Sequence, residues 1–94
     1  EVARGRRFKE KEPLDIRIIA YYPIPQSTSK KRRKEMLEHR IRPTVKPDLD
    51  NVAKLIYDAL NGVAWYDDNA IVDTQVRKFY SDTPRVDVFI RAVE

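Results

Sequence analysis

An amphipathic helix, predicted from Asn51 to Asn61, is the feature that most constrains how this chain can fold. Gly62 follows it directly and is a typical helix stop. One predicted face is apolar and the opposite face is polar: Val52, Leu55, Ile56, Ala59 and Leu60 against Lys54, Tyr57, Asp58 and Asn61. The rest of the chain must therefore supply a surface that covers the apolar face.

Two carboxylates, Asp48 and Asp50, lie at the N-terminal end of this helix. Asp50, Lys54 and Asp58 are spaced four apart, so we expect them on one helix face with the lysine aimed at the acidic end. An Asp before a helix is also what an ordinary N-cap looks like, and for Asp-x-Asp-Asn alone capping is the more common role.

A second acidic pair, Asp67 and Asp68, follows the helix after a short loop. A helix followed by a segment that runs back in the opposite direction can bring the acidic residues before and after the helix close together. Mg²⁺ and Mn²⁺ prefer carboxylate oxygens held from several points. We therefore predict a divalent-metal site formed by Asp48, Asp50 and a carboxylate of the pair Asp67-Asp68.

Three segments are predicted to be strands, at 14–22, 70–80 and 85–94. The first and last alternate clearly, whereas the middle one is blurred, which a bulge or a half-exposed face would explain. We expect the last two to form a hairpin. The chain is then a single α+β domain, residues 1–94, with a small mixed or antiparallel sheet packed against the main helix. Exposed sheet edges favour pairing with a second copy.

Positive charge is concentrated between Lys30 and Lys46, within the excursion 24–46 that follows the first strand. The chain carries a net +4, and eight basic residues against two glutamates leave this segment at +6 and the remainder at −2. A solvated charged segment is one interpretation. The run leads into the acidic site, however, so we predict that it contacts DNA phosphates. Its basic residues are Lys30, Lys31, Arg32, Arg33, Lys34, Arg40, Arg42 and Lys46.

Other residues exclude several classes of protein. The chain has no cysteine, which removes disulfides and thiolate metal sites. It shows neither a transmembrane run nor a signal peptide, so we expect a soluble, cytoplasmic protein. It begins at Glu1, as a fragment would.

The lone His39 is interpreted as a surface residue. Trp65 and Tyr66 precede the acidic pair, where packing over the helix end is expected and stacking on an unpaired base is the alternative.

These motifs resemble the RusA-type Holliday junction resolvases. The resemblance lies in Lys46-Pro47-Asp48-Leu49-Asp50-Asn51, Lys54, Asp58-Ala59-Leu60-Asn61-Gly62, Asp67-Asp68 and Ile71-Val72.

The resemblance implies a homodimer that nicks four-way DNA junctions in recombination and repair. Nicking would require Mg²⁺, with Mn²⁺ as a possible substitute, and would involve neither a small-molecule cofactor nor a membrane. It implies that Asp48, Asp50, Asp68 and Lys54 are catalytic, with the three aspartates as the metal ligands, and that Asp67 is an acidic neighbour. Asn51 would orient a carboxylate or serve as a cap. Such proteins usually begin with a further strand and helix, which we expect to be absent or reduced to residues 1–11.

Two other functions compete with nuclease activity. A non-catalytic nucleic-acid-binding module would use the basic segment 30–46 for phosphates and Tyr21, Tyr57 or Trp65 for stacking. An Asp-x-Asp transferase that binds a nucleotide sugar is disfavoured, because the chain is short and shows no nucleotide-binding glycine loop.

Overall fold

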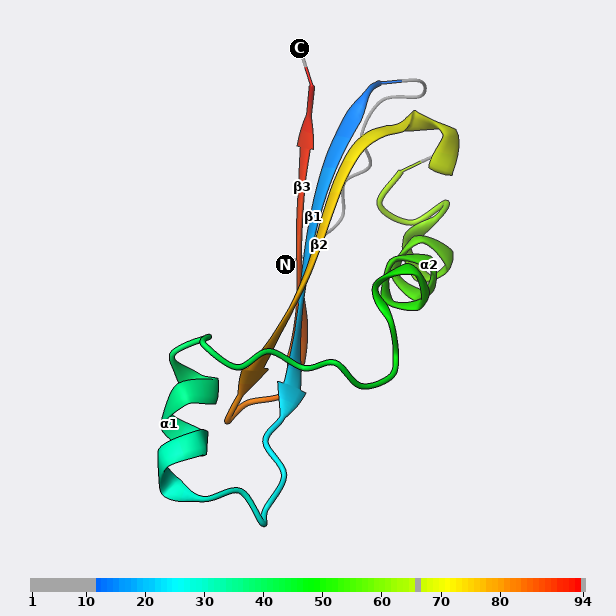
Figure 1. Ribbon diagram of the computed structural model, residues 1–94. Coiled ribbons are helices and arrows are strands. Elements are labelled where there is room, and N and C mark those ends of the chain that lie inside the picture. The colour runs from blue at the N-terminus through cyan, green and yellow to red at the C-terminus, as the bar shows by residue number, and fades with distance from the viewer. Residues whose placement is uncertain (1–11, 66, 94) are drawn as a thin grey trace.

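Three strands form a mixed sheet whose central strand is the first in the chain (Figure 1). The computed structural model describes residues 12–65 and 67–93, so the N-terminal segment 1–11 and Tyr66 lie outside the described residues. Strand β1 (Leu14–Pro23) pairs in parallel with β2 (Ile71–Ser81) and antiparallel with β3 (Arg85–Ala92). The predicted α+β class is confirmed, with a mixed sheet.

The predicted hairpin between the last two strands is wrong, because β1 lies between them. β1 is the most apolar strand, and burying it between two neighbours removes the most apolar surface from water. The three residues 82–84 connect β2 to β3 across the end of β1. Two strand spacings are only about 10 Å, which three extended residues can span.

The core is built on the alternating face of β1. Leu14, Ile16 and Ile18 are fully buried, and Ala20 and Tyr22 are nearly so. These five side chains are the apolar set of the alternating pattern in this strand, so they share one face of the sheet. The remaining core residues come from the helices, the loop after the main helix and the outer strands: Met36, Val52, Ala64, Trp65, Tyr80 and Val88.

A bulge interrupts the pairing of β1 with β2. Leu14 lies opposite Ile71, but Asp15 lies opposite Asp73, so Val72 is an extra residue in β2. The side chain of Val72 is accordingly exposed. The irregular alternation of this strand in the sequence therefore has the physical cause that was predicted for it.

Two helices lie along β2. Helix α1 (Lys30–Leu37) is capped by Ser29, whose Oγ accepts from the Arg32 N–H. Its Met36 is buried in the core, whereas Leu37 is exposed. Helix α2 (Leu49–Leu60) covers one sheet face, and a short 3₁₀ helix, η1 (Asp68–Ala70), leads into β2. No helix in the described part of the chain is long and apolar enough to cross a membrane.

Asp15 should make the stability of the domain sensitive to acid. Arg91 Nε donates to Asp15 Oδ2 over 2.9 Å, and this bond lowers the pKa of the Asp15 carboxyl below its ordinary value of 3.8. The pKa is lower in the folded than in the unfolded chain, so the stabilisation is present above the unfolded pKa and is lost as pH falls through the folded pKa. The melting temperature of the wild type should therefore fall more steeply below about pH 4 than that of Asp15→Asn. Equal slopes for the two proteins would contradict this role.

Candidate active site

A cleft of about 660 Å³ lies between α2 and β2. Asp50, Lys54 and Asp58 line it from the helix, as their spacing of four predicts, and Thr74 and Val76 line it from β2. Asp68 also lines this cleft, from η1, although it lies 18 residues after Asp50 in the sequence. The fold therefore brings two of the predicted catalytic carboxylates and the predicted lysine to one place.

Trp65 fixes the carboxylate of Asp68. Its indole is 1% exposed, and its Nε1–H donates to Asp68 Oδ1 over 2.7 Å. The bond engages one carboxylate oxygen and leaves Oδ2 for another partner. Burial confirms the predicted packing role of Trp65 and excludes its indole as a platform for an unpaired base.

Tyr57 ties the helix to the strand across the cleft. Its hydroxyl donates to Thr74 Oγ1 over 2.9 Å, and its ring meets Trp65 edge-on with the centroids 6.4 Å apart. Both Tyr57 and Thr74 line the cleft. Because this bond joins α2 to β2, it fixes the width of the cleft.

The two remaining acidic candidates cap helices. Asp48 is the N-cap of α2, and its Oδ1 accepts from the Asn51 backbone N–H over 3.1 Å. Asp67 is the N-cap of η1, and its Oδ1 accepts from the Asn69 N–H over 3.0 Å. Neither is among the residues that line the cleft. The N-cap is therefore Asp48 and not Asn51, whose backbone N–H is the donor that Asp48 accepts from.

The donor chemistry of the cleft fits a hard divalent cation. Asp50, Asp58 and Asp68 offer carboxylate oxygens, and Mg²⁺ is typically held by one or two carboxylates with water and phosphate completing its shell. Within residues 12–65 and 67–93, no three His, Cys, Asp or Glu side chains are placed together closely enough to hold an ion. The arrangement is thus three carboxylates along an open cleft, and not a closed protein cage.

Three contacts hold the segment that leads from α1 into the cleft. Arg42 Nε donates to the Lys78 carbonyl over 2.9 Å, and Lys78 Nζ donates to the Val45 carbonyl over 2.6 Å. The Tyr22 hydroxyl donates to the carbonyl of Pro47, immediately before Asp48. Burial, and then the nearby Asp48 carboxylate, raise the pKa of Tyr22 above its ordinary value of 10.0, so this hydroxyl keeps its proton at neutral pH. The start of α2 is therefore fastened to β1 and β2.

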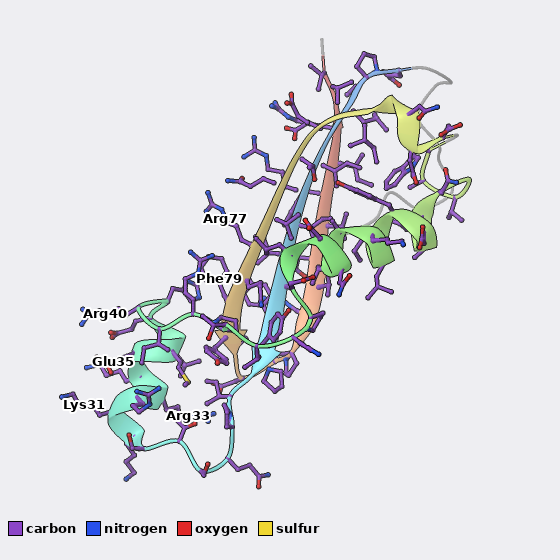
Figure 2. The ribbon with its side chains drawn as sticks, turned by 45° about the vertical axis from the view of Figure 1, so that its right-hand side comes forward. Lys31, Arg33, Glu35, Arg40, Arg77 and Phe79 are labelled. Atoms are coloured by element: carbon purple, nitrogen blue, oxygen red, sulfur yellow. The ribbon has the colours of Figure 1, made fainter. Side chains whose placement is uncertain are left out.

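The basic segment lies beside the end of β2, whereas α2 covers the other half of the sheet (Figures 1 and 2). Arg33 pairs with Asp82, Arg40 pairs with Glu38, and Arg42 packs over the Phe79 ring. The other predicted DNA-contacting residues of the segment are exposed: Lys30, Lys31, Arg32, Lys34 and Lys46. The exposed cations of α1 therefore lie at some distance from the cleft.

The chain matches the family model of endodeoxyribonuclease RusA over residues 2–91, and it belongs to this family. It is 45% identical over 83 residues to the uncharacterized protein YqaN of Bacillus subtilis (strain 168). That alignment covers 86% of this chain and 58% of the relative, so the chain spans little more than half the length of the curated protein that it matches. No solved structure matches the chain significantly.

Proposed function

We propose that this chain is the cleaving domain of a divalent-metal-dependent endonuclease that nicks four-way DNA junctions. The observation that carries the proposal is the cleft between α2 and β2, which is lined by Asp50, Lys54 and Asp68 together. Membership of the RusA family supports cleavage of DNA as the reaction and a four-way junction as the substrate.

Asp50 and Asp68 would hold the cation, and Asp48 is proposed as a third ligand through Oδ2, since its Oδ1 is engaged by the Asn51 N–H. A bound Mg²⁺ or Mn²⁺ supplies charge neutralisation at the scissile phosphate and lowers the pKa of a bound water. Trp65 holds Asp68 through Oδ1, so the second carboxylate oxygen of Asp68 is already oriented before a metal binds. Metal binding would then cost little side-chain entropy at Asp68.

Lys54 is proposed to contact the scissile phosphate. It lines the cleft one helical turn after Asp50, so its ammonium group faces the same space as the carboxylates. Positive charge there stabilises the negative charge that grows on the phosphate oxygens during hydrolysis.

Lys54→Ala should therefore lower the nicking rate of bound junction about 100-fold, while its affinity changes only a few-fold. The matched control is Lys46→Ala, in the basic segment, which should weaken binding and leave the rate of the bound complex unchanged. Single-turnover nicking at saturating protein separates the two quantities. If Lys54→Ala loses affinity and keeps the single-turnover rate, Lys54 is only a phosphate anchor.

The basic segment is proposed to hold the arms of the junction through phosphate contacts, which carry no sequence information. A two-fold homodimer would place two clefts on symmetry-related strands, so that geometry selects the four-way junction over linear DNA. Both proposals are tested by one assay: gel nicking of a synthetic junction and of a linear duplex of the same sequence, with Mg²⁺ or with chelator. The expected result is paired nicks in the junction, only with the metal.

A non-catalytic DNA-binding module is the second candidate. It is favoured by one observation, that the described residues do not gather three metal-ligating side chains. The melting temperature with and without Mn²⁺ discriminates the two, because an ion that binds only the folded chain stabilises it by mass action. At 100 times the dissociation constant the expected stabilisation is about 2.7 kcal/mol. Junction binding with no metal-induced stabilisation and no nicking would favour the module.

A further inference from the structure

Strand β2 contributes side chains to two different surfaces of the protein. Thr74 and Val76 line the cleft, whereas Gln75 and Arg77 belong to the opposite face of the sheet, because side chains alternate along a strand. Figure 2 shows Arg77 and Phe79 directed away from α2. The sheet face opposite α2 is therefore separate from the proposed active site, although one strand serves both.

A hollow of about 230 Å³ lies on this opposite face. Its polar lining is Arg17, Gln75 and Arg77, and its apolar lining includes Ile19 and Phe89. Arg17 Nη1 donates to Gln75 Oε1 over 3.1 Å, which holds one guanidinium at the hollow. The lining contains no carboxylate, and Phe89 is 51% exposed beside it. The hollow is therefore a basic site with an apolar floor.

Two acidic residues of this face are paired with arginines, one of which lines the hollow. Asp15 Oδ2 accepts from Arg91 Nε over 2.9 Å and from Arg17 Nη2 over 3.5 Å, and Asp87 lies 3.4 Å from Arg85 Nε. Arg77, by contrast, has no ion pair or hydrogen bond from its side chain within the described residues. Its charge is thus not neutralised locally, which leaves the hollow open to an anion.

Phe79 connects this sheet face with the basic segment. Phe79 follows Arg77 on the same face, and the His39 ring packs on it with a centroid distance of 4.2 Å. The Arg42 guanidinium lies 4.2 Å from the centroid of the same ring. An aromatic ring holds the flat face of a guanidinium and leaves its edge donors accessible to a phosphate. Arg42 of the basic segment and Arg77 of β2 therefore lie on the same side of the sheet, with Phe79 in contact with Arg42.

We infer that this face is a second DNA-contact surface, on which Arg17 and Arg77 hold a backbone phosphate of an arm that does not enter the cleft. The inference rests on the proposed junction substrate, because only a branched molecule offers separate arms to both faces of β2. A hollow lined by two guanidinium groups and no carboxylate suits a polyanion, whereas a protein partner would need acidic side chains of matching position. The basic segment alone, as predicted from the sequence, is then only part of the DNA interface.

The test compares Arg77→Gln with Arg91→Gln, which carry the same net charge. Arg91 lies on the same face but does not line the hollow. Fluorescence anisotropy with a labelled junction in chelator measures affinity without cleavage. Arg77→Gln should weaken binding about five- to tenfold at 0.1 M salt and lower the salt slope by about 1, whereas Arg91→Gln should change affinity less than about twofold. Circular dichroism checks that both variants are folded.

The outcomes separate this inference from the proposed nuclease function. Equal affinities of the two variants would overturn the second surface, even if the junction is still nicked with Mg²⁺. A change in sedimentation of Arg77→Gln with unchanged DNA affinity would also overturn it, because the face would then be a protein interface. Weaker binding by Arg77→Gln alone supports the inference even in a chain that does not nick.

Discussion

Asp50→Asn is expected to abolish Mg²⁺-dependent nicking of a four-way junction while the protein still binds the junction. Asp50 lines the cleft with Lys54 and Asp68, and the amide removes the negative charge that would hold the cation. Losing about 4 kcal/mol of transition-state stabilisation lowers the rate about a thousandfold. Junction affinity should be unchanged or higher, because one negative charge near phosphate is gone.

The matched control for Asp50→Asn is Asp73→Asn, which makes the same change in charge at an exposed position on β2 that does not line the cleft. It should nick the junction at the wild-type rate. Gel nicking under single-turnover conditions, with anisotropy for affinity, gives both quantities. Undiminished nicking by Asp50→Asn would end the nuclease assignment of this cleft.

Trp65→Ala is expected to remove most of the stability of the folded domain. Trp65 is the largest fully buried side chain, and such truncations cost about 3–5 kcal/mol. A domain of 94 residues has a small core, so most of its stability would be lost. The melting temperature should fall by about 15 °C or more. Urea unfolding measures the loss, and a change below about 1 kcal/mol would contradict the structural role of this indole.

Trp65→Phe separates packing from positioning. Phenylalanine keeps an aromatic ring in the core but has no N–H to donate to Asp68 Oδ1. We expect a folded protein whose nicking rate is lowered about tenfold at fixed metal concentration, because losing such an orienting partner typically costs 10- to 100-fold in metal affinity or activity. Raising the Mn²⁺ concentration should restore part of the rate. A wild-type rate in folded Trp65→Phe would show that the indole N–H does not position Asp68.

The elements of the fold were largely predictable, but their order in the sheet was not. Alternation identifies β1 and the apolar face that it buries, and helical periodicity identifies α2. The order β2-β1-β3 depends on which strand buries the most apolar surface when it is central. No local sequence pattern makes that comparison. The short connection between β2 and β3 favoured a hairpin, and the apolar character of β1 overrode it.

The candidate site was predictable in part, for equally physical reasons. The spacing of Asp50, Lys54 and Asp58 places them along one helix face, and the cleft contains all three. The bond from Trp65 to Asp68 joins a loop residue to the first residue of η1, and no periodic rule predicts such a pair. Tyr57 and Thr74 meet only through tertiary packing.

The basic hollow on the other sheet face was not predicted at all. In the sequence, Arg17, Gln75 and Arg77 look like the solvated side of two ordinary strands. Only the parallel register, which sets Arg17 beside Gln75 and Ile19 beside Arg77, brings them together. Side-chain alternation gives the face of a residue, but strand pairing decides its neighbours.

The central claim is that the cleft between α2 and β2 takes a divalent cation through Asp50 and Asp68. The most direct measurement is anomalous diffraction from crystals of the protein soaked in Mn²⁺, with crystals of Asp50→Asn soaked in the same way. We predict an anomalous peak between these two carboxylates in the wild type and its loss in the variant. A wild-type cleft without such a peak, or a peak that survives in Asp50→Asn, would contradict the account.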